Sequence, residues 1–211
     1  MGSEMCIRDR AETGHLVVAN GGIQTHPDTG REKLNLETMR SSIVFVDPND
    51  GRLIAKHETP DTLQQLSLRH LAFDENGNCY FGGQHQDGGV TDAPMAGSIS
   101  VSGRVQFWAE LRSAALNNYV TSIAAVPGQS LVALSSARAN SVLLVNTVTG
   151  KVIDTYSEFD VSGVVSNGAS VITSSGEGSI NQRMVNADGE SVHQVSMWNP
   201  DVHWDNHMTL R

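Results

Sequence analysis

The chain has 211 residues, of which 39% are hydrophobic and 18% charged, and its formal net charge is −9. This composition is typical of a globular domain that is large enough to bury a core. No stretch approaches the roughly 20 apolar residues of a membrane-spanning helix, so we expect no membrane span. Lys and Arg are scattered singly in an acidic chain, which argues against nucleic acid as a partner, because phosphate binding needs clustered cations.

The first ten residues, MGSEMCIRDR, do not share the pattern of the rest. They resemble a translated sequencing adapter, as found at the start of assembled metagenomic reads. We therefore predict that residues 1–10 are a non-native leader and that the domain occupies residues 11–211. Cys6 falls in this leader, which leaves Cys79 as the domain's single cysteine. Cys79 can form no internal disulfide, and we expect a buried, inert thiol.

A β-rich run, a turn with glycine and a second β-rich run recur along the chain. The turn glycines of this first set are residues 51, 103, 150 and 189, at intervals of 52, 47 and 39 residues. A second set, at residues 77, 128 and 168, lies between them and marks further hairpins. Two hairpins per period make a four-stranded antiparallel unit, and such periods are typical of propeller blades. The sequence thus predicts an all-β fold, a β-propeller with about four blades present.

The same turns divide the chain into blades. We expect blades at residues 69–110, 119–157 and 161–197, most of an earlier blade at 15–58, and the start of another at 203–210. Polar insertions at about 23–41 and 85–95 are expected to be loops, where function often resides. Residues 107–118 have apolar side chains at helical spacing, which predicts a short helix. Because about four blades is the lower limit for a closed ring, we expect a fragment of a larger propeller that exposes apolar blade faces.

Five segments of the chain are distinctive. They are LVVANGGIQTHPDTGREKLNL at 16–36, LSLRHL at 66–71, NYVTS at 118–122, ALSS at 133–136 and WDNH at 204–207. They resemble a bacterial family of propeller proteins, domain-of-unknown-function family 1513, from about residue 15 to the end. The resemblance implies seven blades of WD40-like, YVTN-like or quinoprotein-like type, with this chain as the C-terminal part. It also implies export, often by a twin-arginine signal, and a periplasmic location. Family genes lie beside imelysin-like and di-haem peroxidase-like genes, which implies a link to iron handling.

The candidate site residues come from four parts of the chain, one of which is Asn118. In the 20–35 loop, His26 and Asp28 are potential metal ligands, and Arg31 and Lys33 are potential anion contacts. Arg69 and His70 open an inner strand, and Asp205 and His207 lie near the end. The alternative at each place is structural: hydrogen bonding between blades for the loop and packing for the histidines. The ligand-binding candidates are His26, Asp28, Arg31, Arg69, His70, Asn118, Asp205 and His207, of which His26, His70 and His207 are also metal candidates.

No nucleophile elbow, P-loop, dinucleotide fingerprint or EF-hand loop occurs in the sequence. We therefore interpret the chain as part of a non-catalytic binding or scaffold protein that holds a small ligand or protein partner at the channel mouth. One alternative is a metal-binding redox enzyme or electron-transfer accessory that uses iron or copper on the channel histidines. The other is a purely structural propeller in a larger complex. The sequence itself requires no cofactor.

Overall fold

The computed structural model describes residues 5–8, 14–30, 32–86, 92–186, 188 and 190–209. These residues form four antiparallel sheets of four strands, each an up-and-down meander in chain order. The first sheet contains β1 (Met5–Arg8), β2 (Leu16–Asn20), β3 (Ser42–Val46) and β4 (Leu53–Glu58), and the second contains β5 (Leu66–Phe73), β6 (Cys79–His85), β7 (Ala96–Ile99) and β8 (Val105–Phe107). The third contains β9 (Ser122–Val126), β10 (Leu131–Ser136), β11 (Ser141–Asn146) and β12 (Val152–Ser157), and the fourth contains β13 (Val161–Asn167), β14 (Ser170–Ser175), β15 (Ser179–Val185) and β16 (Ser191–Trp198). Two 3-10 helices, η1 (Pro27–Thr29) and η2 (Asp61–Leu63), lie in the connections.

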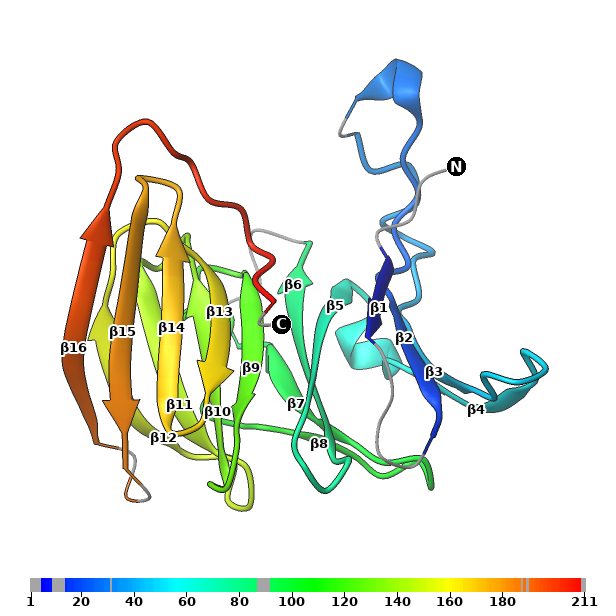
Figure 1. Cartoon of the computed structure of the whole chain (residues 1–211). Coiled ribbons are helices and arrows are strands. Elements are labelled where there is room, and N and C mark those ends of the chain that lie inside the picture. Colours follow the sequence, from blue (N-terminus) through cyan, green and yellow to red (C-terminus); the bar gives the residue numbers. More distant parts are fainter. Residues whose placement is uncertain are drawn as a thin grey trace.

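The sheets stand side by side in a row, with the first and the fourth at opposite ends (Figure 1). The leading strands β1, β5, β9 and β13 contact one another from sheet to sheet, so they form the inner side of the row. This arrangement confirms the predicted β-propeller architecture with about four blades, each made of two hairpins. No helix in the described part of the chain has the length and apolar character needed to cross a membrane.

The predicted turn glycines have the backbone conformation that a tight hairpin requires. In the first set, φ is +73° at Gly51, +91° at Gly103 and +70° at Gly150, in the turns that lead to β4, β8 and β12. The second set, residues 77, 128 and 168, also has positive φ. Only glycine enters this region without a steric cost from Cβ, which is why the repeat was visible in the sequence. Gly189 lies outside the described residues.

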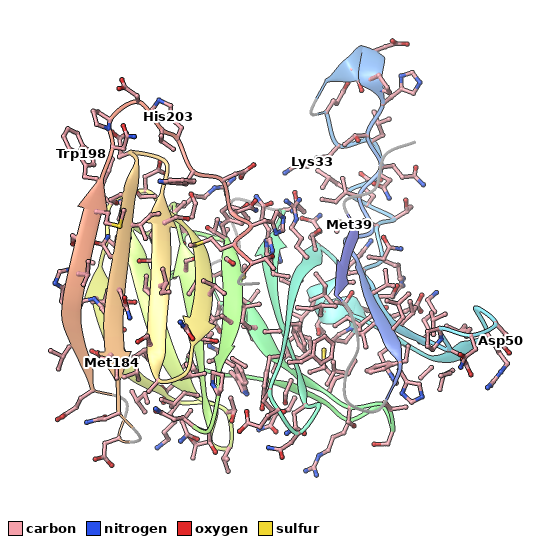
Figure 2. All side chains as sticks on the ribbon, viewed as in Figure 1. Lys33, Met39, Asp50, Met184, Trp198 and His203 are labelled. Atoms are coloured by element: carbon pink, nitrogen blue, oxygen red, sulfur yellow. The ribbon has the colours of Figure 1, made fainter. Side chains whose placement is uncertain are left out.

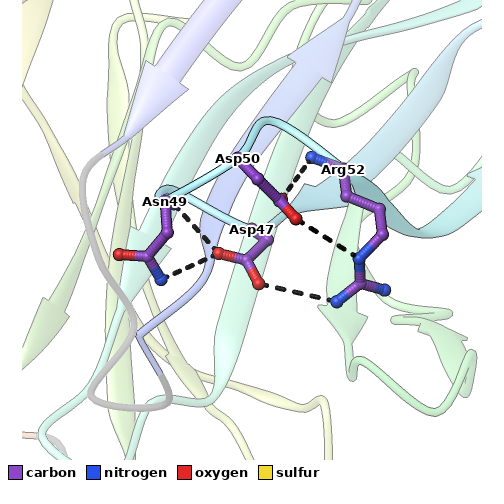
Figure 3. A network of polar contacts seen from close by, with 4 residues as sticks. All are labelled: Asp47, Asn49, Asp50 and Arg52. Atoms are coloured by element: carbon purple, nitrogen blue, oxygen red, sulfur yellow. Dashed lines mark hydrogen bonds and ion pairs between the residues drawn. The ribbon is translucent and has the colours of Figure 1, made fainter.

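Polar contacts stabilise the β3–β4 turn, as Figure 3 shows. The Asp47 carboxylate accepts hydrogen bonds from the backbone N–H (2.9 Å) and the side-chain amide (3.0 Å) of Asn49. Arg52 lies 3.5 Å from Asp47 and 3.8 Å from Asp50. The pKa of Asp47 is lowered, chiefly by the hydrogen bond from the Asn49 backbone. The sequence DPNDGR therefore forms a turn held by its own side chains.

The hydrophobic core lies between the sheets. Strand β10 is buried along its whole length because its sheet is covered on both faces, whereas the outer strand β12 alternates between half-buried and exposed positions. The largest fully buried side chains include Trp108, Phe45 and Phe81. The outer strand β16 of the fourth sheet instead exposes apolar groups, and Trp198 is 70% exposed. Figure 2 shows Trp198 at the far end of the row.

Three details differ from the sequence expectations. The helix predicted at 107–118 is wrong: β8 ends at Phe107, and turns follow. Asn117 and Asn118 have φ of +45° and +61°, which right-handed helices do not contain, and the apolar residues Trp108, Leu111 and Leu116 are buried from turns. The start of another blade was expected at 203–210, but residues 203–209, the described part of this range, form no strand.

The third difference concerns the N-terminus. Met5–Arg8, within the residues set apart as a leader, pairs as β1 with the edge of β2 in antiparallel register. A free sheet edge accepts any extended segment through backbone groups alone, so this pairing does not depend on side-chain identity. The non-native origin of residues 1–10 stays a prediction.

Candidate functional site

A cavity of about 620 Å³ lies where four parts of the row meet. The loop between β2 and β3 contributes one wall, β5 and β6 a second, and the segments before β9 and after β10 a third. The residues that follow β16 complete it. Its volume falls in the range of small-molecule sites, about 300–1,000 Å³. The lining residues are Ile23, Thr25, Gly30, Lys33, Arg69, Gln84, Gln86, Tyr119, Arg138 and Asp205.

The walls of this cavity carry three cations, Lys33, Arg69 and Arg138, and one carboxylate, Asp205. The Lys33 ammonium donates a hydrogen bond to the backbone carbonyl of Gln86 (3.1 Å). Burial lowers the pKa of Lys33, and the charges of Arg138 and Arg69 lower it further. The three cations are thus close enough to act on one another, although the chain as a whole is acidic.

Each of the two arginines contacts a neighbouring side chain that positions it. The Arg138 guanidinium lies over the Tyr119 ring, 5.2 Å from its centroid, in a cation–π contact. Arg69 Nε donates to Ser67 Oγ at 3.3 Å. Neither Lys33 nor Arg138 forms an ion pair with another described residue. The cations that do so include Arg40, Arg52, Lys56 and Arg112.

The loop that carries Lys33 is closed at its base by amide hydrogen bonds. Asn35 Oδ1 accepts from the Gln24 backbone N–H (2.8 Å), and Asn35 Nδ2 donates to the Gly22 carbonyl (2.9 Å). Gly22 has φ of +72°, and a Cβ there would collide with the backbone carbonyl of Arg40, so only glycine fits. The loop projects beyond the end of the first sheet (Figure 1), and Lys33 points from it toward the other sheets (Figure 2).

The residues after β16 cross back over the inner strands. His203 Nδ1 donates to the Gly176 carbonyl at 2.6 Å, and the ring of His207 lies 5.7 Å from that of His70 on β5. Met208 packs against Gly163 of β13, where a Cβ would come within 2.6 Å of its Cγ. These contacts fix the segment along its length and bring Asp205 to the cavity.

The structure separates the predicted site residues into groups. Arg69 and Asp205 line the cavity, and His70 and His207 pack together beside it. His26 and Asp28 are exposed and pair with each other, since the Asp28 backbone N–H donates to His26 Nδ1 at 3.3 Å.

Asn118 forms part of the turn before β9. Its backbone carbonyl accepts from the His85 N–H at 3.0 Å, and its buried Oδ1 has no hydrogen-bond partner among the described residues. Arg31 lies outside the described residues. In the described ranges, no three His, Cys, Asp or Glu side chains are grouped so that they would hold a metal ion. A metal centre on the histidines therefore stays a hypothesis from the sequence.

Sequence reasoning singled out Lys33 as an anion contact but missed Arg138, Tyr119, Gln84 and Gln86. Tyr119 belongs to the distinctive NYVTS segment, which was a signal that could have been followed. Arg138 is an isolated cation in the short turn between β10 and β11. Nothing in its local sequence distinguishes it from a solvated surface arginine.

Comparison with known structures identifies the class of fold. The chain is similar to a chain titled "Structure of U3-55K", at 10% identity and a TM-score of 0.57, over 90% of this chain and 54% of that one. It is also similar to a chain of "Crystal Structure of Mitotic Checkpoint Complex", at 15% identity and a TM-score of 0.59, over 93% of this chain and 67% of that one. The chain therefore spans about half the length of the first. At these identities the likeness shows the fold alone, which is of the β-propeller type.

Comparison with protein families gives a more specific result. The family model "Protein of unknown function (DUF1513)" matches residues 4–211, and the chain belongs to this family. A search of curated proteins finds no match.

Proposed function

We propose that this protein is a non-catalytic binding protein that holds an anionic ligand in the cavity lined by Lys33, Arg69 and Arg138. The observation that carries the proposal is the convergence of three cations from separate segments on one cavity. Burial, followed by the charges of Arg138 and Arg69, lowers the pKa of Lys33 there. Like charges held together in this way repel one another. A bound anion removes the repulsion, so its binding is favoured over that of a neutral ligand.

The arginines and amides of the walls support a binding role. Arginine stays protonated at all physiological pH values, and the amides of Gln84 and Gln86 do not titrate. Such groups recognise and orient an anion, but they do not exchange protons with it. The anion is either a small molecule or an acidic side chain of a protein partner at the channel mouth.

The family resemblance supports the remaining parts of the proposal. These are a propeller with WD40-like, YVTN-like or quinoprotein-like blades, export to the periplasm, and a link to iron handling. They rest on the resemblance alone. Fractionation of cells that express the whole gene would test the location, and recovery of the protein with the cytoplasmic fraction would contradict it.

Isothermal titration of the 211-residue chain with inorganic phosphate and with succinate tests the cavity directly. We expect binding of at least one anion by the wild type and a loss of about tenfold or more for Arg138→Gln, because a hydrogen bond to a charged group contributes about 1.5–3 kcal/mol. Lys151→Gln is the matched control, since it removes one exposed cation outside the cavity lining. Absence of binding by the wild type, or an equal loss in both variants, would overturn the proposal.

A further inference from the structure

The charge composition of the cavity restricts the kind of anion that it can hold. Three cations and one carboxylate line it, so its walls carry a net charge of +2. Besides burial, the charges of Arg138 and Arg69 act on Lys33. Lys33 lies in the β2–β3 loop, Arg69 on β5 and Arg138 between β10 and β11, whereas Asp205 comes from the segment after β16, so the carboxylate and the cations enter the cavity from different segments.

Asp205 is unfavourable for an anion unless the ligand donates a hydrogen bond to it. Its Oδ1 accepts from the backbone N–H of Asn206 at 2.7 Å, and the other carboxylate oxygen retains its acceptor capacity. A carboxylate in a cationic site repels a simple anion, but it attracts a hydroxyl or ammonium group on the same ligand. It is thus a means of discrimination between related anions.

Asp205 reaches the cavity through several fixed contacts. His203 is bonded to the Gly176 carbonyl, His207 packs on His70, and Met208 packs on Gly163. These contacts lie on both sides of Asp205 in the chain, so they hold its backbone in place over the inner strands. Its position at the cavity is therefore set by the fold.

The remaining lining residues and the volume agree with an organic ligand that carries hydroxyl groups. Gln84, Gln86 and Tyr119 offer neutral hydrogen-bonding groups between the charged ones. The cavity volume of about 620 Å³ is about twenty times the volume of one water molecule, far more than an inorganic ion fills. The space therefore accommodates a small organic molecule.

We propose that the ligand is a small organic molecule with a net charge near −2 and a hydroxyl or amino group, whose acidic groups contact Lys33, Arg69 and Arg138 and whose donor group binds Asp205. This inference rests on the proposed function and gives the chemical class of its ligand. The acidic groups are carboxylates or phosphates, since the arginine fork matches both.

Two matched pairs of probes test the inference by titration calorimetry on the 211-residue chain. L-malate and succinate differ by one hydroxyl among dicarboxylates, and glycerol 3-phosphate and propyl phosphate differ by hydroxyls among phosphate esters. We expect the hydroxylated member to bind about tenfold more tightly in at least one pair, and the pair with the higher affinity identifies the acidic group.

The variant Asp205→Ala is expected to bind both members of that pair with about equal affinity. Its affinity for the analogue without the hydroxyl should be the same as that of the wild type or higher. Asp201→Ala, an exposed aspartate in the same segment, is expected to keep the wild-type preference. Equal binding within both pairs by the wild type would overturn the role of the hydroxyl and leave the anion site standing. No binding of any probe would overturn both this inference and the proposed function.

Discussion

Replacement of Gly150 by alanine is expected to destabilise the propeller more than the same replacement at Gly128, another hairpin glycine. Gly150 ends the β11–β12 turn with φ of +70°, and its N–H donates to the Asn146 carbonyl at 2.8 Å. A Cβ at this position would lie 2.5 Å from Cδ1 and 3.0 Å from Cγ of Trp108. Trp108 is only 1% exposed and packs beside Tyr80, with ring centroids 5.9 Å apart, so its ring has little room to move.

The expected loss has two parts. An alanine held in the left-handed region costs about 1–2 kcal/mol. Insertion of a methyl group into a filled space costs about 1–3 kcal/mol more. Gly150→Ala should therefore lower the free energy of unfolding by about 2–5 kcal/mol. For a chain of this length, each kcal/mol corresponds to about 2–4 °C in melting temperature.

Gly128→Ala is the matched control. Gly128 has φ of +72°, nearly the same as Gly150, but nothing lies within 4 Å of its Cβ position. Only the backbone cost of about 1–2 kcal/mol applies there. Urea unfolding followed by tryptophan fluorescence measures both variants, and equal losses would refute the argument that Trp108 requires glycine at position 150.

Three further substitutions test other contacts. The pKa of Lys33 is lowered in the folded chain, so above that value the unfolded chain binds more protons than the folded chain and the free energy of unfolding rises with pH. Lys33→Gln should remove this rise, and urea midpoints of the wild type and the variant at pH 7 and pH 10 would detect the difference. The ionised Asp47 carboxylate stabilises the fold above its ordinary pKa, and this contribution disappears as pH falls through its lowered pKa in the folded chain. Asp47→Asn should therefore reduce the loss of stability in acid. An unchanged dependence of the free energy of unfolding on acidic pH would contradict this. Ser41→Ala should cost about 1–3 kcal/mol, because the buried Ser41 Oγ donates to the Leu66 carbonyl (2.6 Å) and accepts from the Leu68 N–H (3.2 Å), and a melting temperature within 1 °C of the wild type would show that these groups find other partners.

The fold was predictable because hairpin turns leave a chemical mark. A turn that needs positive φ selects glycine, and glycines at residues 77, 103, 128 and 150 placed successive hairpins within a few residues of their observed positions. The segment 107–118 was mispredicted because the spacing of buried apolar residues does not reveal whether a helix or a series of turns delivers them to the core. Asn117 and Asn118, which tolerate the left-handed region, were the local sign of turns.

The candidate site was predictable only in part, because its charges come from distant segments. Arg69 and Asp205 were identified from short motifs, but their approach to Lys33 and Arg138 depends on how the sheets stand next to one another. Histidines drew the prediction toward metal chemistry. The structure gives His207 a packing contact with His70 and leaves His26 beside Asp28 in solvent. Sequence motifs thus indicated Lys33, Arg69 and Asp205, which line one cavity, and gave no sign that Arg138 joins them.

The contrast between the acidic chain and its cationic cavity has a consequence for binding kinetics. The net charge of −9 repels an approaching anion over distances comparable to the Debye length, about 8 Å at physiological ionic strength, whereas the three cations attract it only near the cavity. Added salt screens both effects. The association rate constant for an anionic probe should therefore rise or stay level between 50 and 300 mM NaCl, while the dissociation rate constant rises because the attraction in the complex is weakened. Stopped-flow measurements at several salt concentrations separate the two. A steep fall of the association rate constant with salt would contradict this expectation. It would show that the positive potential of the cavity extends beyond the acidic surface and attracts the anion from a distance.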